Sequence, residues 1–202
     1  MEMKFGELGW DEVSSGSGSF LDLKEGVNTV RVFTKPYVFY VHWYRDSSGA
    51  TRKIKCATAG CPLCKEGVKV QKRYYLGVLD RGSKSPKIME ATAQVVNGIK
   101  ELATGKWGDP KKYDVDIKRA PKGTQPLYTV SPDPDRTEFT DEEKTAIKAF
   151  MNDTDFMKLC KPATVDEVLE KMGKGPAPKE EEPASTDSDD ESFDFNDDDF
   201  NI

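Results

Sequence analysis

Histidine is almost absent from this chain, and so are the sequence patterns of the common hydrolases. His42 is the single histidine among 202 residues, beside four cysteines. The sequence contains no Walker-type glycine loop and no His-Glu-x-x-His motif, so nothing in it predicts nucleotide hydrolysis or zinc proteolysis. If His42 binds a metal, no histidine is left to act as a general base. The sequence therefore points away from an enzyme.

Long apolar stretches are also missing. The longest apolar and aromatic run, Tyr37 to Tyr44, is far shorter than the roughly 20 residues that a membrane helix needs. The first nine residues lack the apolar stretch of a signal peptide, and 33% of all residues are charged. We expect a soluble protein without a membrane partner in a reducing, cytoplasmic setting, where clustered cysteines are better interpreted as metal ligands than as disulfides.

Three of the four cysteines follow the histidine closely. Thirteen residues separate His42 from Cys56, four separate Cys56 from Cys61, and two separate Cys61 from Cys64. Thiolate sulfur and neutral imidazole suit zinc, and a Cys-x-x-Cys turn presents two sulfurs to one ion. A shell of three cysteines and one histidine leaves no position open for water. The spacing predicts one structural Zn²⁺ ion, with His42, Cys56, Cys61 and Cys64 as its ligands.

Other interpretations of these cysteines stay open. Cys61 and Cys64 have the spacing of a redox pair, but such pairs begin a helix after a strand-helix-strand pattern, which this stretch lacks. All three cysteines can also be ordinary small core residues. Asp46 or the distant Cys160 can replace His42 as the fourth ligand. Otherwise we expect Cys160 to be a buried free thiol.

Charge is distributed unevenly along the chain. Residues 176–202 hold eleven acidic side chains and one basic one, a net charge of −10. Residues 31–122 hold 20 basic and eight acidic side chains, a net charge of +12, although the whole chain carries −6. A basic middle is the electrostatic pattern of a protein that binds a polyanion.

Short strands dominate the predicted secondary structure. We expect a short helical segment from Lys65 to Lys72, and helical spacing predicts a longer helix from Ile88 to Ala103. Two capping boxes, Thr140 to Glu143 and Thr164 to Glu167, predict later helices. We expect a mainly β fold with accessory helices, of the α+β class, in which an OB-fold-like barrel carries an inserted zinc-binding subdomain. Alternating or aromatic-rich segments predict strands over residues 28–35, 37–44, 51–55, 73–80, 113–120 and 125–131.

The two ends of the chain differ in composition from its middle. Residues 1–19 end in a run of serine and glycine that is typical of a flexible segment. Residues 20–172 form the predicted core, with the zinc-binding subdomain at about residues 42–72. Residues 173–202 are too charged and too poor in aliphatic side chains to fold alone, so we expect a disordered acidic tail.

Aromatic and basic residues are interleaved through the middle of the chain. The bases of single-stranded nucleic acid stack on exposed rings while cations follow the phosphates. We expect Tyr40, Tyr44, Tyr75 and Trp107 to be exposed, although strand alternation sends about half of such rings inward. A solvated basic face is the alternative for the cluster from Lys111 to Lys122. The predicted DNA contacts are Tyr40, Trp43, Tyr44, Arg52, Lys53, Lys55, Lys69, Lys72, Arg73, Tyr75, Trp107, Lys111, Lys112, Lys118, Arg119 and Lys122.

A family resemblance rests on these features together. His42, then Cys56, then Cys61-Pro-Leu-Cys64, inside an aromatic and basic OB-like core, resembles the zinc-containing single-stranded DNA-binding (helix-destabilising) proteins of T-even-type phages. The resemblance covers residues 28–131 in the order of motifs, and the acidic tail in character. It implies a structural zinc on the same four ligands, sequence-independent coating of single-stranded DNA, and roles in phage replication, recombination and repair. The first ten residues lack the basic arm that supports cooperative binding in that family.

The tail's last residues also resemble the acidic-aromatic tips of bacterial single-stranded DNA-binding proteins. Such a tail can lie in a basic groove, compete with DNA, and capture replication and recombination proteins once DNA displaces it. A solubilising tail is the alternative, but such a tail has little use for aromatic rings. The partner-binding residues that we predict are Phe193, Phe195, Asp197, Asp198, Asp199 and Phe200.

Two other functions compete with this prediction. Asp114 and Asp116 share one face of a predicted strand and can hold Mg²⁺ in a nuclease, although a solvent-exposed pair between lysines needs no metal. A zinc-ribbon RNA-binding or transcription factor is the stronger alternative. It predicts a preference for RNA or for a defined site, whereas the coating of DNA predicts little discrimination among strands of equal length.

Overall fold

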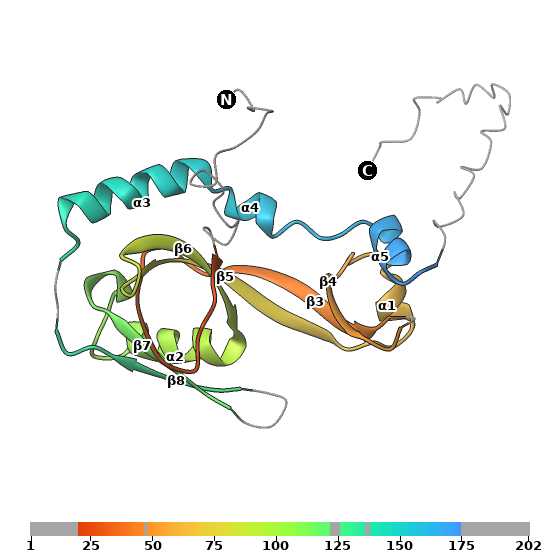
Figure 1. Ribbon diagram of the computed structural model, residues 1–202, viewed down its shortest axis with the longest axis horizontal. Helices are drawn as coiled ribbons and strands as arrows, with labels where there is room; N and C mark the ends of the chain where they lie inside the picture. The colour runs from red at the N-terminus through yellow and green to blue at the C-terminus, as the bar shows by residue number, and fades with distance from the viewer. Residues whose placement is uncertain (1–19, 47, 122–125, 136–137, 175–202) are drawn as a thin grey trace, which may run out of the picture.

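The computed structural model describes residues 20–46, 48–121, 126–135 and 138–174. The predictions for residues 1–19, for Lys122 and for residues 175–202 of the acidic tail lie outside the described residues. Within them, a mixed sheet combines with several helices (Figure 1), which confirms the predicted mainly β, α+β class. No helix in this part of the chain is long and apolar enough to cross a membrane.

Eight strands form the sheet in the described part of the chain. Their order is β1-β6-β5-β2-β7-β8, and β3 pairs with β5 on one side and with β4 on the other. β1 runs parallel to β6, while β5 pairs antiparallel with β2, β3 and β6. The strands are β1 Phe20–Leu21, β2 Gly26–Val32, β3 Tyr37–Arg45, β4 Thr51–Lys55, β5 Val70–Asp80, β6 Ser85–Thr92, β7 Val115–Ala120 and β8 Leu127–Pro132.

β5 joins the two parts of the sheet. Its second half pairs with β2 through Val78 to Asp80, and its first half pairs with β3 through Val70 to Tyr75. β6 follows β5 only from Arg73 onward. The arm, which consists of β3, β4 and residues 70–75 of β5, therefore extends away from the rounded body of the sheet (Figure 1).

The main core lies between the body of the sheet and helix α2, Ala93–Thr104. Thr92 begins this helix, because its side-chain oxygen accepts a hydrogen bond from the Val95 amide at 3.4 Å. Gly98 brings the helix close to β8, since a β-carbon at this position would lie 2.8 Å from the side chain of Val130. The core residues include Val30, Val32, Leu76, Val78, Met89, Val95, Ile99, Tyr113, Val115 and Ile117.

Three helices return from the body of the sheet to the arm (Figure 1). They are α3 Asp141–Asp153, α4 Phe156–Leu159 and α5 Val165–Lys171. Both predicted capping boxes are present, at Thr140 before α3 and at Thr164 before α5. Phe156 fixes α4 in place, because its ring stacks on Tyr37 of the arm with the ring centroids 4.8 Å apart.

A network of ion pairs connects β2, the turn after β5, and α3. The side chain of Arg31 is fully buried and donates to Asp114 Oδ1 at 2.6 Å, while Arg81 donates to Asp114 Oδ2 at 2.8 Å and also pairs with Glu143 of α3. Both oxygens of Asp114 are thus engaged, and Asp116 accepts from the Thr29 hydroxyl at 2.6 Å. This pairing argues against the magnesium interpretation of the two aspartates.

Two predicted helices are wrong in part. The helix expected from Lys65 to Lys72 is instead α1, Pro62–Lys65, after which the chain turns into β5. The helix expected from Ile88 begins only at Ala93, because residues 85–92 pair with β5 as β6. The short helix α1 ends where Gly67 adopts a φ of 76°. From Ile88 to Thr92 the apolar spacing fits either period, and pairing with β5 decides for a strand.

Candidate metal centre and nucleic-acid interface

Three connected segments bring the four predicted zinc ligands together. His42 lies on β3, Cys56 directly follows β4, and Cys61 and Cys64 lie at the start of α1. The ligand atoms of all four residues are within 4.8 Å of one another. The turn between the segments depends on backbone in the left-handed region at Thr58 and Gly60, with φ of 61° and 73°.

The distances fit one tetrahedral ion. Cys56 Sγ and Cys64 Sγ are 3.6 Å apart, and His42 Nε2 lies 3.6 Å from Cys61 Sγ and 3.4 Å from Cys64 Sγ. Zinc bonds of about 2.3 Å to sulfur and about 2.0–2.1 Å to nitrogen give tetrahedral edges of roughly 3.8 Å between sulfurs and roughly 3.6 Å between sulfur and nitrogen. The donor set and its spacing therefore suit zinc, as the sequence predicts.

The second nitrogen of His42 gives a further reason to expect a metal. The residue is 0% exposed, and its Nδ1 has no hydrogen-bond partner among the described residues. A buried nitrogen without a partner costs about 1–3 kcal/mol. A metal bond at Nε2 offsets such a cost, whereas packing alone gives no reason to bury an imidazole here. Cys160 is not part of this cluster and is a free, half-buried thiol, less buried than predicted.

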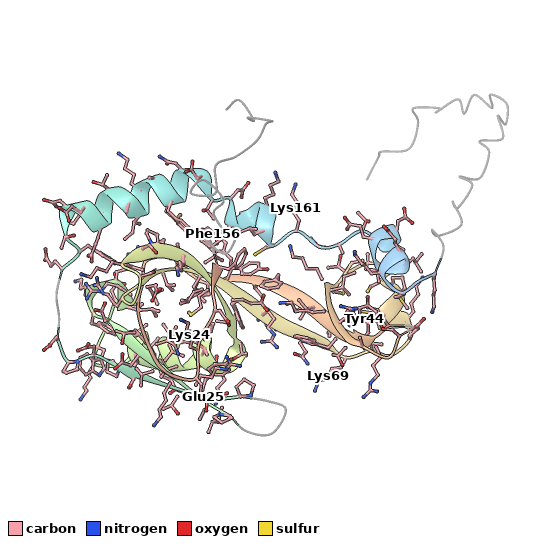
Figure 2. All side chains as sticks on the ribbon, in the orientation of Figure 1. Lys24, Glu25, Tyr44, Lys69, Phe156 and Lys161 are labelled. Carbon is pink, nitrogen blue, oxygen red and sulfur yellow. The ribbon has the colours of Figure 1, made fainter. Side chains whose placement is uncertain are left out.

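The zinc module, which we define as residues 42–72 together with α5, has a very small core. Its hydrophobic cluster has five buried members, Cys56, Ala57, Cys61, Leu63 and Val168 of α5, and two of them are predicted metal ligands, as is the buried His42. Tyr44 packs on this cluster (Figure 2), and its hydroxyl donates to the Lys171 carbonyl at 2.9 Å. A core of this size supplies little folding energy without a metal or other covalent support.

A groove lies beside the arm, where it meets the start of α2 and β8. It has a volume of about 810 Å³. Four predicted DNA contacts line it together: Trp43, Lys69, Lys72 and Arg73. The side chain of Trp43 is 41% exposed, and no lining residue is acidic. The remaining lining residues are Thr51, Gln71, Thr92, Ala93, Gln94, Pro126 and Tyr128.

The far wall of this groove comes from residues that the sequence did not single out. Gln94 of α2 donates to the Tyr128 carbonyl at 2.9 Å, which ties the helix to β8 beside the tyrosine ring. Gln71 accepts from Arg73 at 3.2 Å and orients its guanidinium. Tyr128 lies in a predicted strand, but only the packing of β8 near α2 brings it opposite the arm.

The arm presents a second set of predicted contacts on its opposite face. Adjacent residues of a strand point to opposite sides of a sheet, so Tyr40 lies on the other face from Trp43. Tyr40 is 43% exposed and is paired in register with Lys72 of β5, whose ammonium lies 5.5 Å from the centre of the Tyr74 ring. Lys72 also lines the Trp43 groove, so it is common to both sets of predicted contacts, whereas Tyr40 belongs to the second set alone.

Three basic residues of β4 are occupied by partners within the protein. Arg52 pairs with Asp46 at 2.7 Å. The hydrogen bond from the Ser48 hydroxyl, together with the Arg52 pair, holds the pKa of Asp46 well below its usual range. Lys53 pairs with Glu90 at 2.8 Å and also lies over the Trp43 ring. Lys55 donates to the Leu159 carbonyl. These contacts link the arm to its neighbours and make the three residues less available to a nucleic acid.

Three of the four rings that we expected to be exposed are not. Tyr75 is only 7% exposed and stacks on Phe39 with the ring centroids 4.1 Å apart. Tyr44 is half-buried in the zinc module, and Trp107 packs half-buried against the main core and Tyr113. Long-range packing accounts for all three corrections, and Tyr40 alone among the four is exposed as predicted.

Burial gives Tyr75 an unusual titration that can be tested. Burial, with the charges of Glu90 and Cys160, raises the pKa of Tyr75 to about 12. The unfolded chain loses this phenolic proton near pH 10, so it binds fewer protons than the folded protein between pH values of about 10 and 12. Between pH values of about 10 and 12, we expect the free energy of unfolding to fall less in Tyr75→Phe than in the unaltered protein. Urea unfolding at several pH values measures both. An equal fall in both proteins contradicts the assignment.

The other predicted basic contacts lie on the body of the sheet. Lys111 and Lys112 are exposed in the 3₁₀ turn Pro110–Lys112, and Lys118 is exposed on β7. Arg119 is half-buried, and its Nη1 donates to the Leu23 carbonyl at 2.5 Å. None of these residues lines the Trp43 groove.

Comparison with known proteins gives one distant match. The chain is 24% identical to a protein of Escherichia phage T5 described as a probable ssDNA-binding protein, over 150 residues that cover 60% of this chain and 58% of that protein. The chain therefore spans less than two thirds of the length of this relative. No protein-family model and no solved structure matches the chain.

Proposed function

We propose that this chain binds single-stranded DNA without regard to sequence, along the Trp43 groove. The observation that carries the proposal is the lining of the groove, where an exposed tryptophan and three cations meet and no acidic side chain lies. Bases stack on aromatic faces whatever their identity, and cations track the phosphates. The name of the phage T5 relative supports the same ligand.

Each part of the groove has a role in this proposal. Trp43 and Tyr128 stack on bases from opposite walls, and Lys69 and Arg73 bind phosphates. A Zn²⁺ ion held by His42, Cys56, Cys61 and Cys64 fixes the arm and takes no part in chemistry. Lys111, Lys112, Lys118 and Lys122 extend the path of the strand as further contacts, and Tyr40, on the opposite face of the arm, contributes only weakly.

The wider proposal follows the family resemblance. The body of the sheet acts as an OB-like barrel that carries the arm and the zinc module as an insertion. The protein coats and protects single strands during phage replication, recombination and repair in the host cytoplasm. The residues from Phe193 to Phe200 recruit replication and recombination proteins, and the acidic tail competes with DNA for the basic groove.

A fluorescence titration tests the ligand. We expect oligo-dT to quench tryptophan emission more strongly than matched duplex, because only unpaired bases can stack on Trp43. Because three cations line the groove, a plot of the logarithm of the binding constant against the logarithm of the salt concentration should have a slope of about −2 or steeper. Trp43→Phe should remove the quenching, and Trp107→Phe should retain it. Tighter binding to RNA or to a defined site supports the zinc-ribbon alternative and contradicts the proposal.

Deletion of the tail tests the competition. Without residues 176–202, which carry a net charge of −10, the affinity for oligo-dT at low salt should rise several-fold. The effect should disappear at high salt, because it is electrostatic and is screened over about 10 Å at 0.1 M salt. A second variant keeps the full length of the tail but replaces its acidic side chains with serine and asparagine. It separates the effect of charge from the effect of chain length. An unchanged affinity in both variants contradicts the competition.

A further inference from the structure

A second groove follows the C-terminal half of α2, apart from the Trp43 groove. It has a volume of about 450 Å³, within the range of sites that hold small groups. Val96, Ile99 and Ala103 of α2 form one wall through successive turns of the helix, because residues three and four apart share a face. The remaining apolar lining comes from Val32, Pro36, Leu76 and Pro110. We call this site the α2 groove.

Lysines surround this apolar lining. Lys35, Lys100 and Lys111 all line the α2 groove and are exposed, and none pairs with an acidic side chain of the described residues. Asp109 is the one acidic lining residue, and its Oδ1 accepts from the Lys111 amide at 3.0 Å. An apolar slot with three unpaired cations at its rim suits an apolar side chain that is flanked by carboxylates.

The α2 groove is poorly suited to a nucleotide base. Its lining contains no aromatic ring for stacking. Apart from the three lysines, its only polar side chains are Thr34 and Asp109. A base placed there leaves most hydrogen-bonding groups on its edges without partners, which costs free energy. A phenylalanine ring has no such groups and gains by burial.

The chain itself contains a segment of the required chemistry. Phe193, Phe195 and Phe200 alternate with four aspartates over residues 193–202. Phe200 lies 26 positions after Lys174, the last described residue, which gives a maximum reach of about 85 Å. This reach exceeds the sum of the roughly 40 Å diameter of a compact body and the roughly 30 Å length of the nine-residue strand β3 in the arm. The segment can therefore reach the groove of its own molecule.

We propose that residues 193–202 dock in the α2 groove of the same chain, with a phenylalanine in the apolar slot and aspartates on the lysines. The Trp43 groove begins at Thr92, Ala93 and Gln94, at the other end of the same helix. Docking therefore holds the acidic residues 180–191 close to Lys69 and Arg73 at a high effective concentration. This inference deepens the proposed competition between tail and DNA, because it separates an anchoring site from the competing charges.

Photo-crosslinking in the full-length protein tests the docking without DNA, so its failure leaves the proposed DNA binding untouched. The variant Phe200→p-benzoylphenylalanine carries a photoreactive side chain at position 200. It is irradiated at moderate salt, and the crosslinked peptides are identified by mass spectrometry. We expect crosslinks within one molecule to α2 or to residues near Pro36 and Pro110. Lys100→Glu should lower the yield about threefold to tenfold, and Lys148→Glu on the exposed face of α3 should leave it unchanged.

Three outcomes overturn the proposal. Crosslinks to residues 69–73 mean that the tip itself occupies the Trp43 groove. Crosslinks between two molecules, with a yield that rises with protein concentration, mean that the groove binds a second copy. A yield equal to that of Ser185→p-benzoylphenylalanine means that the tip has no preferred site. Ala103→Leu, which fills the slot without changing charge, provides a second variant that should lower the yield if the docking is correct.

Discussion

Cys61→Ser is expected to unfold the zinc module while the main core stays folded. Structural zinc supplies on the order of 10 kcal/mol of folding free energy in small sites, and three of the four predicted ligands are themselves buried residues of the module. The main core draws on β2, β5, β6, β7 and α2, none of which holds a ligand. The loss of the metal should therefore be local.

The same change should weaken DNA binding. His42 and Trp43 are neighbours on β3 and point to opposite faces, so the metal that fixes one also fixes the strand that presents the other. Lys69 precedes β5 within the module and loses its position as well. We expect the affinity for oligo-dT to fall about 10- to 100-fold, which corresponds to the loss of one or two stacked bases.

Three measurements distinguish this result from general unfolding. The zinc content should fall from one ion per chain to near zero, and hydrogen exchange should rise in residues 51–68 and in α5 but not in α2. Cys160→Ser, which changes the free cysteine outside the cluster, should keep the zinc and the affinity. Metal-free protein with full affinity and unchanged exchange contradicts a structural role for zinc.

The zinc ligands could be predicted from the sequence because their geometry is mostly local. Cys56, Cys61 and Cys64 lie within one turn and the start of α1, and His42 pairs in register with Ile54 just before Cys56. A hairpin of predictable length therefore sets all four positions. The Cys-x-x-Cys spacing left little freedom for another outcome.

The exposed rings could not be predicted in the same way, because exposure depends on distant partners. Tyr75 lies beside Tyr37 and Glu90 on two neighbouring strands, and β6 was expected to be a helix. Without β6, no neighbour that covers Tyr75 could be predicted. Tyr128 was missed for the same reason, since its place opposite the arm depends on the packing of α2 against β8.

Near the metal cluster, the arm has a structural face and a proposed binding face, whereas closer to the body Phe39 and Val41 of the Trp43 face are buried in a cluster with Phe156 of α4. On one face His42 and Tyr44 belong to the metal cluster and its packing. On the other face Trp43 and Arg73 line the groove. Tyr40 shares the face of His42 but lies farther from the cluster along β3, and it is as exposed as Trp43. A comparison of these two aromatic residues can therefore locate the path of the strand.

Trp43→Ala is expected to lower the affinity for oligo-dT about 5- to 150-fold, since stacking contributes about 1–3 kcal/mol per base. Tyr40→Ala should lower it less than threefold, because Tyr40 faces away from the groove. The two residues are 41% and 43% exposed on the same strand, so truncation costs similar folding free energy in each. Competition binding with a labelled oligo-dT measures both variants without relying on tryptophan emission. If Tyr40→Ala has the larger effect, the strand follows the opposite face of the arm, and the groove that Trp43 lines is not the DNA site.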